Sequence, residues 1–374
     1  MGYKNGSEAG AYFTVIANPS LKWETQISTD IALEFGLFDR LTGTIEYFKK
    51  DSKDLLFDVS QPASVGVTSI IQNIGKVTNS GVEIELDYNA FKNKDWSVSV
   101  GANATFVKNK IKNLPATMKE NGYISGSKKW LEGKSIYEFW LRQWHGVDPQ
   151  TGDGLYVADV SKYNQGNIGT GDGNITQSQF DEYKKTVVTI DGKELTNSYT
   201  YAKYDFSGSS IPDVYGGFNV RVSYKNFDLA AVFSYQLGGQ ILDTNYATMM
   251  SMTEFGYAQS PDLLKAWKQA GDITEVPRID NSAAHTTNIG QSYSTRWLTS
   301  SDYLNLRSVT IGYQLPKTWL SKVMLKSARL NLTAENLFML KARQGLNPMA
   351  NYSGVTYNEY MPSRNITLGL NVSF

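Results

Sequence analysis

The chain has 374 residues, 41% of them hydrophobic, which is enough for one large core or for roughly two or three domains. Its 36 basic and 36 acidic residues balance, so it carries no basic footprint for nucleic acid. Cysteine is absent, which excludes disulfides and thiolate metal sites.

Helical membrane spans are excluded as well, because no stretch approaches the ~18 consecutive apolar residues that such a helix needs. The mean hydropathy of −0.35 does not separate a soluble protein from a membrane β-barrel. Barrel strands alternate between lipid-facing and lumen-facing residues, so their average looks soluble. Residues 1–6 contain no apolar signal core, so we expect either a cytoplasmic chain or one whose true beginning is missing.

Alternation of apolar and polar residues with period two dominates the chain and predicts β-strands. It is clearest at 365–374, where every even position is apolar. There we expect Ile366, Leu368, Leu370 and Val372 to face lipid, and Asn365, Thr367 and Asn371 to face a wet lumen. In chain order the eleven predicted strands are 21–37, 41–50, 78–88, 96–106, 136–147, 154–160, 214–224, 227–235, 303–313, 328–337 and 364–374.

The predicted linkers alternate in length, as in bacterial membrane barrels with short periplasmic turns and long extracellular loops. The short ones are 38–40, 89–95, 148–153, 225–226 and 314–327, and the long ones are 51–77, 107–135, 161–213, 236–302 and 338–363. The alternation of short and long linkers is kept only if 136–147 and 154–160 are both strands of the barrel wall, or if both lie outside it as a hairpin in the lumen. The count is therefore eleven or nine, and we favour eleven.

Two short helices are expected inside the long loops. Ser260 is a helix cap followed by Pro261, and Gly271 is the stop signal. Residues 177–185 form the second candidate.

A soluble antiparallel sandwich also alternates and is the main alternative on pattern alone. Its strands are usually about five or six residues long, whereas these run to ten or more. Long linkers without structure of their own are also unusual in compact soluble domains. The pattern therefore favours a membrane barrel.

Candidate catalytic and metal-binding residues are few. The two histidines, His145 and His285, belong to no catalytic or metal motif, and we expect His145 near Trp140 and Trp144 in the barrel wall or lumen. Residues 169–175 lack the ending of a phosphate loop. As a calcium loop, Asp172 fits the fifth position, but Ile168 and Gln179 would occupy the first and twelfth, so a solvated loop is the better interpretation.

Aromatic residues crowd the long loops, and such rings stack on sugars, pack against peptides, form an interfacial girdle or fill loop cores. We assign no catalytic, cofactor-binding or metal residue, expect no cofactor, and leave the substrate-binding residues open. The aromatic residues of the loops include Trp130, Tyr293, Trp297, Tyr352, Tyr357 and Tyr360.

The chain resembles the SusC/RagA family of TonB-dependent outer-membrane transporters of Bacteroidetes, over nearly its whole length. Each block of resemblance is weak alone, but their order and spacing are specific. The blocks are residues 18–24, 35–38, 54–56, 73–83, 146–152, 211–213, 216–218, 224–229, 302–307, 312–316, 334–338 and the final Phe374.

The resemblance implies an all-β fold, a transmembrane antiparallel barrel of 22 strands, to which residues 1–374 contribute the C-terminal part. The plug domain and the N-terminal strands have no counterpart in this sequence. The implied function is energised import of oligosaccharides or peptides across the outer membrane, not enzyme catalysis. The implied partners are a SusD-like surface lipoprotein, the TonB complex and outer-membrane lipid. The rival function is a soluble or surface-attached carbohydrate-binding module.

Overall fold

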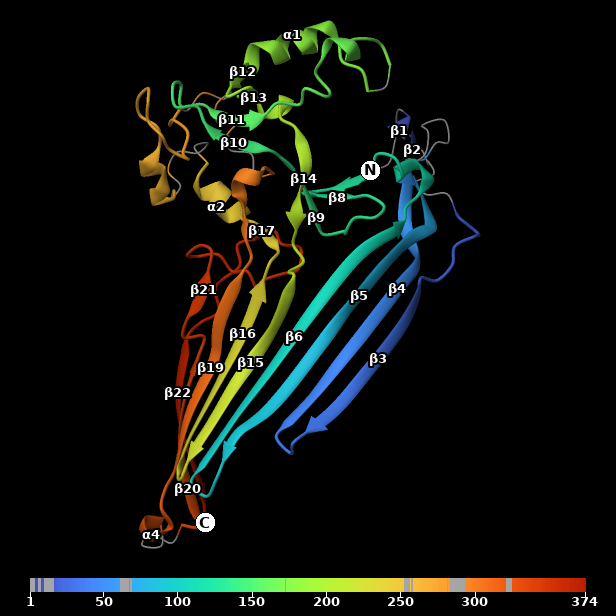
Figure 1. Ribbon diagram of the computed structural model, residues 1–374. Coiled ribbons are helices and arrows are strands. Elements are labelled where there is room, and N and C mark those ends of the chain that lie inside the picture. The colour runs from blue at the N-terminus through green and yellow to red at the C-terminus, as the bar shows by residue number, and fades with distance from the viewer. Residues whose placement is uncertain are drawn as a thin grey trace.

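A long antiparallel sheet, called the wall below, dominates the computed structural model (Figure 1). The structure describes residues 4–5, 8–9, 17–60, 67, 69–171, 173–251, 256, 258–280, 282, 285, 289, 293–320 and 325–374. The wall strands are β3 (Thr25–Leu37), β4 (Leu41–Ser60), β5 (Ser69–Lys92), β6 (Trp96–Asn113), β15 (Val214–Tyr224), β16 (Phe227–Leu237), β19 (Tyr303–Gln314), β20 (Ser327–Glu335), β21 (Met339–Lys341) and β22 (Asn365–Ser373).

Nine of these strands follow one another in the order β22-β20-β19-β16-β15-β6-β5-β4-β3, and β21 pairs with β19 beside them. The predicted all-β wall is therefore confirmed, but the count of eleven is wrong. β6 pairs directly with β15, with Thr105 opposite Tyr215, so nothing lies between them in the wall. The count of nine, which left both 136–147 and 154–160 out of the wall, is the one observed.

Residues 136–160 instead build small sheets beyond one end of the wall (Figure 1). They form β9 (Glu138–Arg142), β10 (Trp144–Val147) and β11 (Gly154–Val157), each of five residues or fewer. Their alternation reflects burial against other loops: Phe139 and Leu141 are fully buried while their neighbours are partly exposed. The alternation of apolar and polar residues thus identified true strands but could not indicate which sheet they join.

The wall strands β4 and β5 are longer than the sequence indicated. They have 20 and 24 residues and occupy most of the predicted linker 51–77. Their pairing shifts register between Ser52 and Leu56, around Asp54, which has a positive φ of 56°. A bulge of this kind interrupts the alternation of apolar and polar residues, so the sequence pattern does not reveal that the strand continues.

The two ends of the wall differ, as the linker lengths predicted. Turns 38–40, 93–95 and 225–226 and the segment around α4 (Lys317–Leu320) lie at one end, and the long loops lie at the other (Figure 1). The linker 148–153 is an exception and that prediction was wrong. Its carbonyl groups at Pro149 and Gly152 accept hydrogen bonds from Gly271 and Arg278 of a long loop, so it belongs to the loop end.

The long loops contain their own secondary structure. α1 (Gln177–Thr186) confirms the predicted helix and begins with a reciprocal capping box between Thr176 and Gln179. Ser260 caps only a short 3-10 helix, Pro261–Lys265, which ends before the expected Gly271. The other loop elements are β7 (Tyr123–Ser125), β8 (Lys128–Trp130), β12 (Val187–Ile190), β13 (Lys193–Thr196), β14 (Tyr204–Ser209), β17 (Gln240–Leu242), α2 (Thr244–Met249) and β18 (Leu298–Ser300).

The largest buried core of the described residues lies in the loops, because the wall is a single layer. A cluster that includes Phe139, Trp297 and Val355 joins segments from the three longest loops. Among the helices that the structure describes, none has the length and apolar character needed to span a membrane.

Candidate functional site

One face of the wall is polar from strand to strand. Side chains of directly paired residues in a sheet point to the same face. The row that starts at Glu34 contains almost only polar residues, and the adjacent row pairs Glu46 with Glu83. The first row reads Glu34, Thr44, Glu85, Asn103, Gly217, Ser234 and Asn305.

The opposite face is apolar over the same strands. One row reads Leu33, Ile45, Ile84, Ala104, Gly216, Tyr235 and Leu304. A second row continues through Ile311 and Leu332 to Leu368, which is 74% exposed. This continuous exposed apolar surface is too extensive for a monomer in water and fits contact with lipid. It also places the even residues of 365–374 on the apolar face, as the alternation predicted.

An aromatic band crosses the apolar face near the short turns. Trp96, Tyr224, Phe227 and Tyr313 are consecutive partners on four neighbouring strands. The ring centroids of Trp96 and Tyr224 are 4.3 Å apart, and those of Phe227 and Tyr313 are 4.4 Å apart. Aromatic rings at this level are typical of a membrane–water interface, because one side of each ring is apolar and the other is wet.

The loops at the other end are joined by a buried carboxylate. Asp243 caps α2 by accepting a hydrogen bond from the Tyr246 amide (3.0 Å), and it accepts further bonds from Thr356 (3.4 Å) and Arg343 (3.3 Å). The Arg343 guanidinium also lies 3.5 Å from the centroid of the Tyr246 ring. This contact, called the Asp243 clamp below, ties the segment 342–363 to the segment 238–302.

Stacked cations stabilise the small sheets of the loops. The Arg142 guanidinium lies 3.4 Å from the ring centroid of Tyr199 and donates a hydrogen bond to the Tyr204 hydroxyl. Burial raises the pKa of Tyr199 to about 12, which keeps this phenol neutral. Arg296 stacks between Trp144 and Trp297, and burial lowers its pKa to about 10. Both cations are engaged within the fold.

The loop aromatics that the sequence singled out have two different fates. Trp130 donates its indole N–H to the Ile136 carbonyl (3.2 Å) and packs edge-on against Phe57, and Trp297 is almost completely buried. These two rings form loop cores. The rings of the last loop remain open, with Tyr352, Tyr357 and Tyr360 exposed by 81%, 67% and 95%, and Tyr293 is 40% exposed.

One of the open rings, Tyr352, is held near the start of a wall strand. The Tyr352 carbonyl accepts a hydrogen bond from the Ser210 hydroxyl (3.0 Å), just before β15 begins at Val214. Tyr352 therefore lies near the junction between the wall and the loops. Sequence alone could list this residue as an aromatic of a long loop but could not separate it from the buried rings.

The histidines fall in different environments. His145 is exposed on β10 in a loop sheet, so the expectation that it belongs to the barrel wall or lumen was wrong. His285 is buried, with its Nε2 2.8 Å from the Arg278 carbonyl and its Nδ1 3.9 Å from Asp153. Asp172 of the possible calcium loop lies outside the described residues. Within the described part of the chain, no group of three His, Asp or Glu side chains could hold a metal ion.

Comparison with known proteins agrees with the two-faced wall. Residues 1–337 match the family model described as "TonB dependent receptor-like, beta-barrel". The chain belongs to this family. Its wall is therefore part of an outer-membrane β-barrel, and the resemblance to SusC and RagA is confirmed. The polar face is the lumen face and the apolar face meets lipid.

Relatives and solved structures extend the match. TonB-dependent receptor P3 of Formosa agariphila is 29% identical over 384 residues and is covered for 36% of its length by 98% of this chain. SusC of Bacteroides thetaiotaomicron is 24% identical, with 96% of this chain covering 32% of that protein. The structure of the RagAB peptide importer in its closed-closed state is 25% identical with a TM-score of 0.76, and all of this chain covers 38% of that chain. The chain thus spans about a third of the length of these relatives.

Proposed function

We propose that this chain supplies wall strands and extracellular loops to a larger TonB-dependent importer, which moves an oligosaccharide or a peptide across the cell outer membrane. The observation that carries the proposal is the register of the wall, which separates a lipid face from a polar lumen face over nine consecutive strands. A soluble carbohydrate-binding module, the rival function, has no use for an apolar face of this extent. This chain would form part of the passage for the substrate and would not catalyse a reaction.

Two partners form part of the proposal. A plug domain from the remainder of the protein would fill the lumen and respond to TonB. A SusD-like surface lipoprotein would cover the long loops, which expose Leu264 and Ile273 by 79% and 97% on the segment 258–280. The matches to the TonB-dependent receptor SusC and to the RagAB peptide importer support a TonB-dependent import system of this kind.

Uptake by living cells tests the proposal. A strain without the full-length protein is expected to lose growth on one oligosaccharide or peptide source in a panel, and the cloned gene should restore it. Depletion of TonB should abolish the same growth. If the deletion strain grows normally on every source and also binds each substrate normally, the import function is wrong.

The orientation of the chain can be tested separately. An epitope inserted at Gly192, in the exposed turn between β12 and β13, should be labelled by antibody on intact cells. The matched insertion at Asn226, in the short turn between β15 and β16, should be labelled only after the outer membrane is opened. The reverse pattern would place the long loops in the periplasm and would exclude their proposed role in substrate capture.

A further inference from the structure

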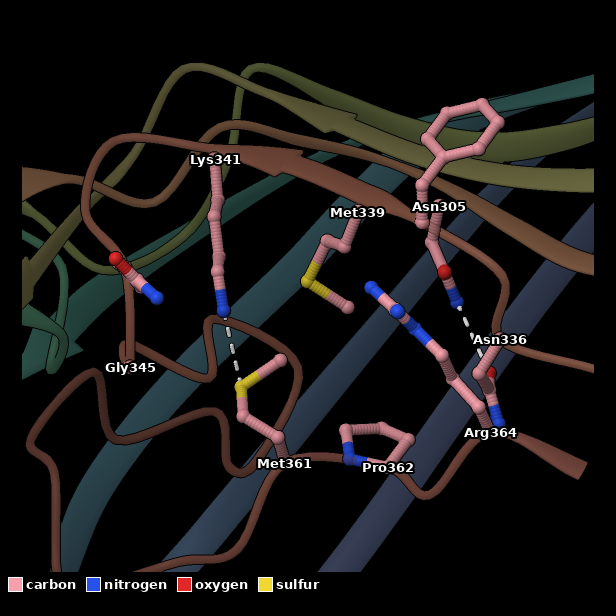
Figure 2. A pocket seen from close by; sticks show the side chains of 10 residues that line it. Asn305, Asn336, Met339, Lys341, Gly345, Met361, Pro362 and Arg364 are labelled. Atoms are coloured by element: carbon pink, nitrogen blue, oxygen red, sulfur yellow. Dashed lines mark hydrogen bonds between the residues drawn. The ribbon is translucent and has the colours of Figure 1, made fainter.

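A pocket opens on the lumen face just below the last long loop (Figure 2). Met339 and Lys341 of β21 pair with Asn305 and Tyr303 of β19, which belong to the two polar rows. The side chains of Asn305, Met339 and Lys341 therefore face the lumen. The volume is about 470 Å³, which is within the range of small-molecule sites.

The pocket exists because the chain leaves the wall at Asn336 and returns. Asn336 has a positive φ of 51°, which ends β20, and its amide oxygen accepts a hydrogen bond from Asn305 (3.5 Å). β21 then continues the pairing with β19, and the last loop folds back across it. Lys341 holds this loop by donating to the Leu346 carbonyl (2.8 Å) and to the Met361 sulfur (3.1 Å).

The lining carries positive charge that no acidic group balances. It contains Lys341 and Arg364 but no Asp or Glu. Figure 2 shows the Arg364 guanidinium turned toward Met339 and Asn305. Arg364 is exposed and forms no hydrogen bond or ion pair with any residue that the structure describes.

The remaining lining indicates the kind of anion. The amides of Asn305, Asn336 and Gln344 add hydrogen-bonding groups, while Met339, Met361 and Pro362 provide an apolar wall beside the cations. A planar guanidinium pairs with a carboxylate through two parallel hydrogen bonds, and an ammonium adds a point charge. An apolar wall beside such a pair suits a carboxylate that is attached to a compact organic group.

We propose that this pocket binds a carboxylate group of the imported ligand, with Arg364 as the bidentate partner and Lys341 as the second cation. The inference rests on the proposed import function, because it makes the pocket a subsite on the route through the lumen. The carboxylate can be the C-terminus of a short peptide or the uronate of an acidic sugar. Neutral oligosaccharides offer neither cation an anionic partner and bind poorly.

Calorimetric titration of the full-length protein in detergent tests the subsite. The probes are trialanine, trialanine amide, trigalacturonic acid and galactose 6-sulfate. Arg364→Gln and Lys341→Gln remove the cations, Arg364→Lys keeps a charge, and Arg40→Gln and Lys225→Gln are matched controls in the short turns at the opposite end of the wall. Heat-resistant migration of each variant in gels verifies that the barrel is folded.

The expected result is that a carboxylate probe binds and that each cation-removing variant weakens it about tenfold or more. Arg364→Lys should recover part of this loss, and the two controls should bind as the parent does. Binding of trialanine but not of its amide assigns the carboxylate to a peptide, and cation-dependent binding of trigalacturonic acid alone assigns it to an acidic sugar. Any of four results would overturn the proposal. The first is equal affinity for trialanine and its amide without binding of trigalacturonic acid, and the second is equal binding by the parent and the folded variants. The others are a preference for galactose 6-sulfate and no binding of any probe.

The titration needs neither TonB nor a partner, so its outcome is separate from that of the uptake experiment. If cells without the protein take up the substrate normally and the purified protein still shows cation-dependent binding in detergent, the proposed import function is wrong and the proposed carboxylate site stands. If uptake is lost without the protein but Arg364→Gln binds the probes as the parent does, the import function stands and the proposed carboxylate site is wrong.

Discussion

The guanidinium of Arg329 on β20 donates a hydrogen bond of 2.6 Å to the carboxylate of Asp228 on β16, although β19 lies between these two strands. The pair crosses β19 at Gly312, which is the direct partner of Asp228. A Cβ atom at Gly312 would lie 2.3 Å from the Arg329 guanidinium and 2.7 Å from the Asp228 carboxylate. Gly312 therefore leaves room for this ion pair, which links β20 to β16 across β19 on the lumen face.

The first prediction compares two glycines of the same polar row. Gly312→Ala should lower the free energy of unfolding by ~1–3 kcal/mol, because the added methyl group pushes the ion pair apart. Gly369→Ala, whose Cβ would meet only the Asn331 carbonyl at 4.0 Å, should change it by less than about 0.5 kcal/mol. Urea unfolding of the full-length protein in lipid vesicles measures both values. Equal values for the two variants would show that the ion pair does not depend on the space above Gly312.

Much of the wall could be predicted from sequence, because its strands have two long and uniform environments. At 365–374 every apolar residue meets lipid and every alternate residue meets the lumen, so period two is preserved to the end. The same rule failed where the environment changed within a strand. At Asp54 a bulge breaks the period, and at 136–160 short strands alternate because of contacts with other loops.

The interactions of the site were less accessible from sequence. Arg329 and Asp228 are 101 residues apart and belong to no motif. Lys341 and Arg364 come from opposite ends of a loop, and only the fold of the segment 342–363 brings them to one pocket. The aromatic composition of the loops left substrate contact, an interfacial girdle and loop cores open, and packing decided that Tyr352 is exposed and Trp297 is buried.

The second prediction tests which face meets lipid. Leu368 pairs with Leu332 on the apolar face, and Thr367 pairs with Thr333 on the polar face. Leu368→Arg should destabilise the barrel by ~2–4 kcal/mol if it lies near the middle of the membrane, whereas Thr367→Arg should be tolerated because the lumen is wet. The amounts of heat-resistant protein in purified outer membranes measure the difference. Similar loss for both variants would contradict the assignment of the faces.

The third prediction concerns the Asp243 clamp. Asp243→Ala removes the cap of α2 and leaves Arg343 without its buried carboxylate, so the segment 342–363 should detach more often from the neighbouring loop. Trypsin added to intact cells should then cleave this segment several-fold faster. Asp302→Ala is the control, because this carboxylate lies on a wall-proximal loop and forms no ion pair with the residues that the structure describes. Unchanged cleavage of Asp243→Ala would show that hydrophobic packing alone holds the loops together.

The last prediction concerns the pH dependence of the β8–β9 contact. Lys128 is buried beside Phe139, with its ammonium 3.1 Å from the ring centroid and donating to the Tyr137 carbonyl (2.9 Å). Burial lowers the pKa of Lys128 from 10.5 to about 7, and the charge of Glu138 only partly opposes this shift. Between these two values the open form binds more protons than the closed form, so closure should strengthen as the pH rises from about 7 to about 10. Subtilisin should therefore cleave the hairpin of β7 and β8 more slowly at about pH 9 than at about pH 6, relative to a Lys128→Met variant measured at each pH. An identical ratio at both pH values would mean that Lys128 keeps its charge in the folded loop and that the ring and the carbonyl offset the cost of burial.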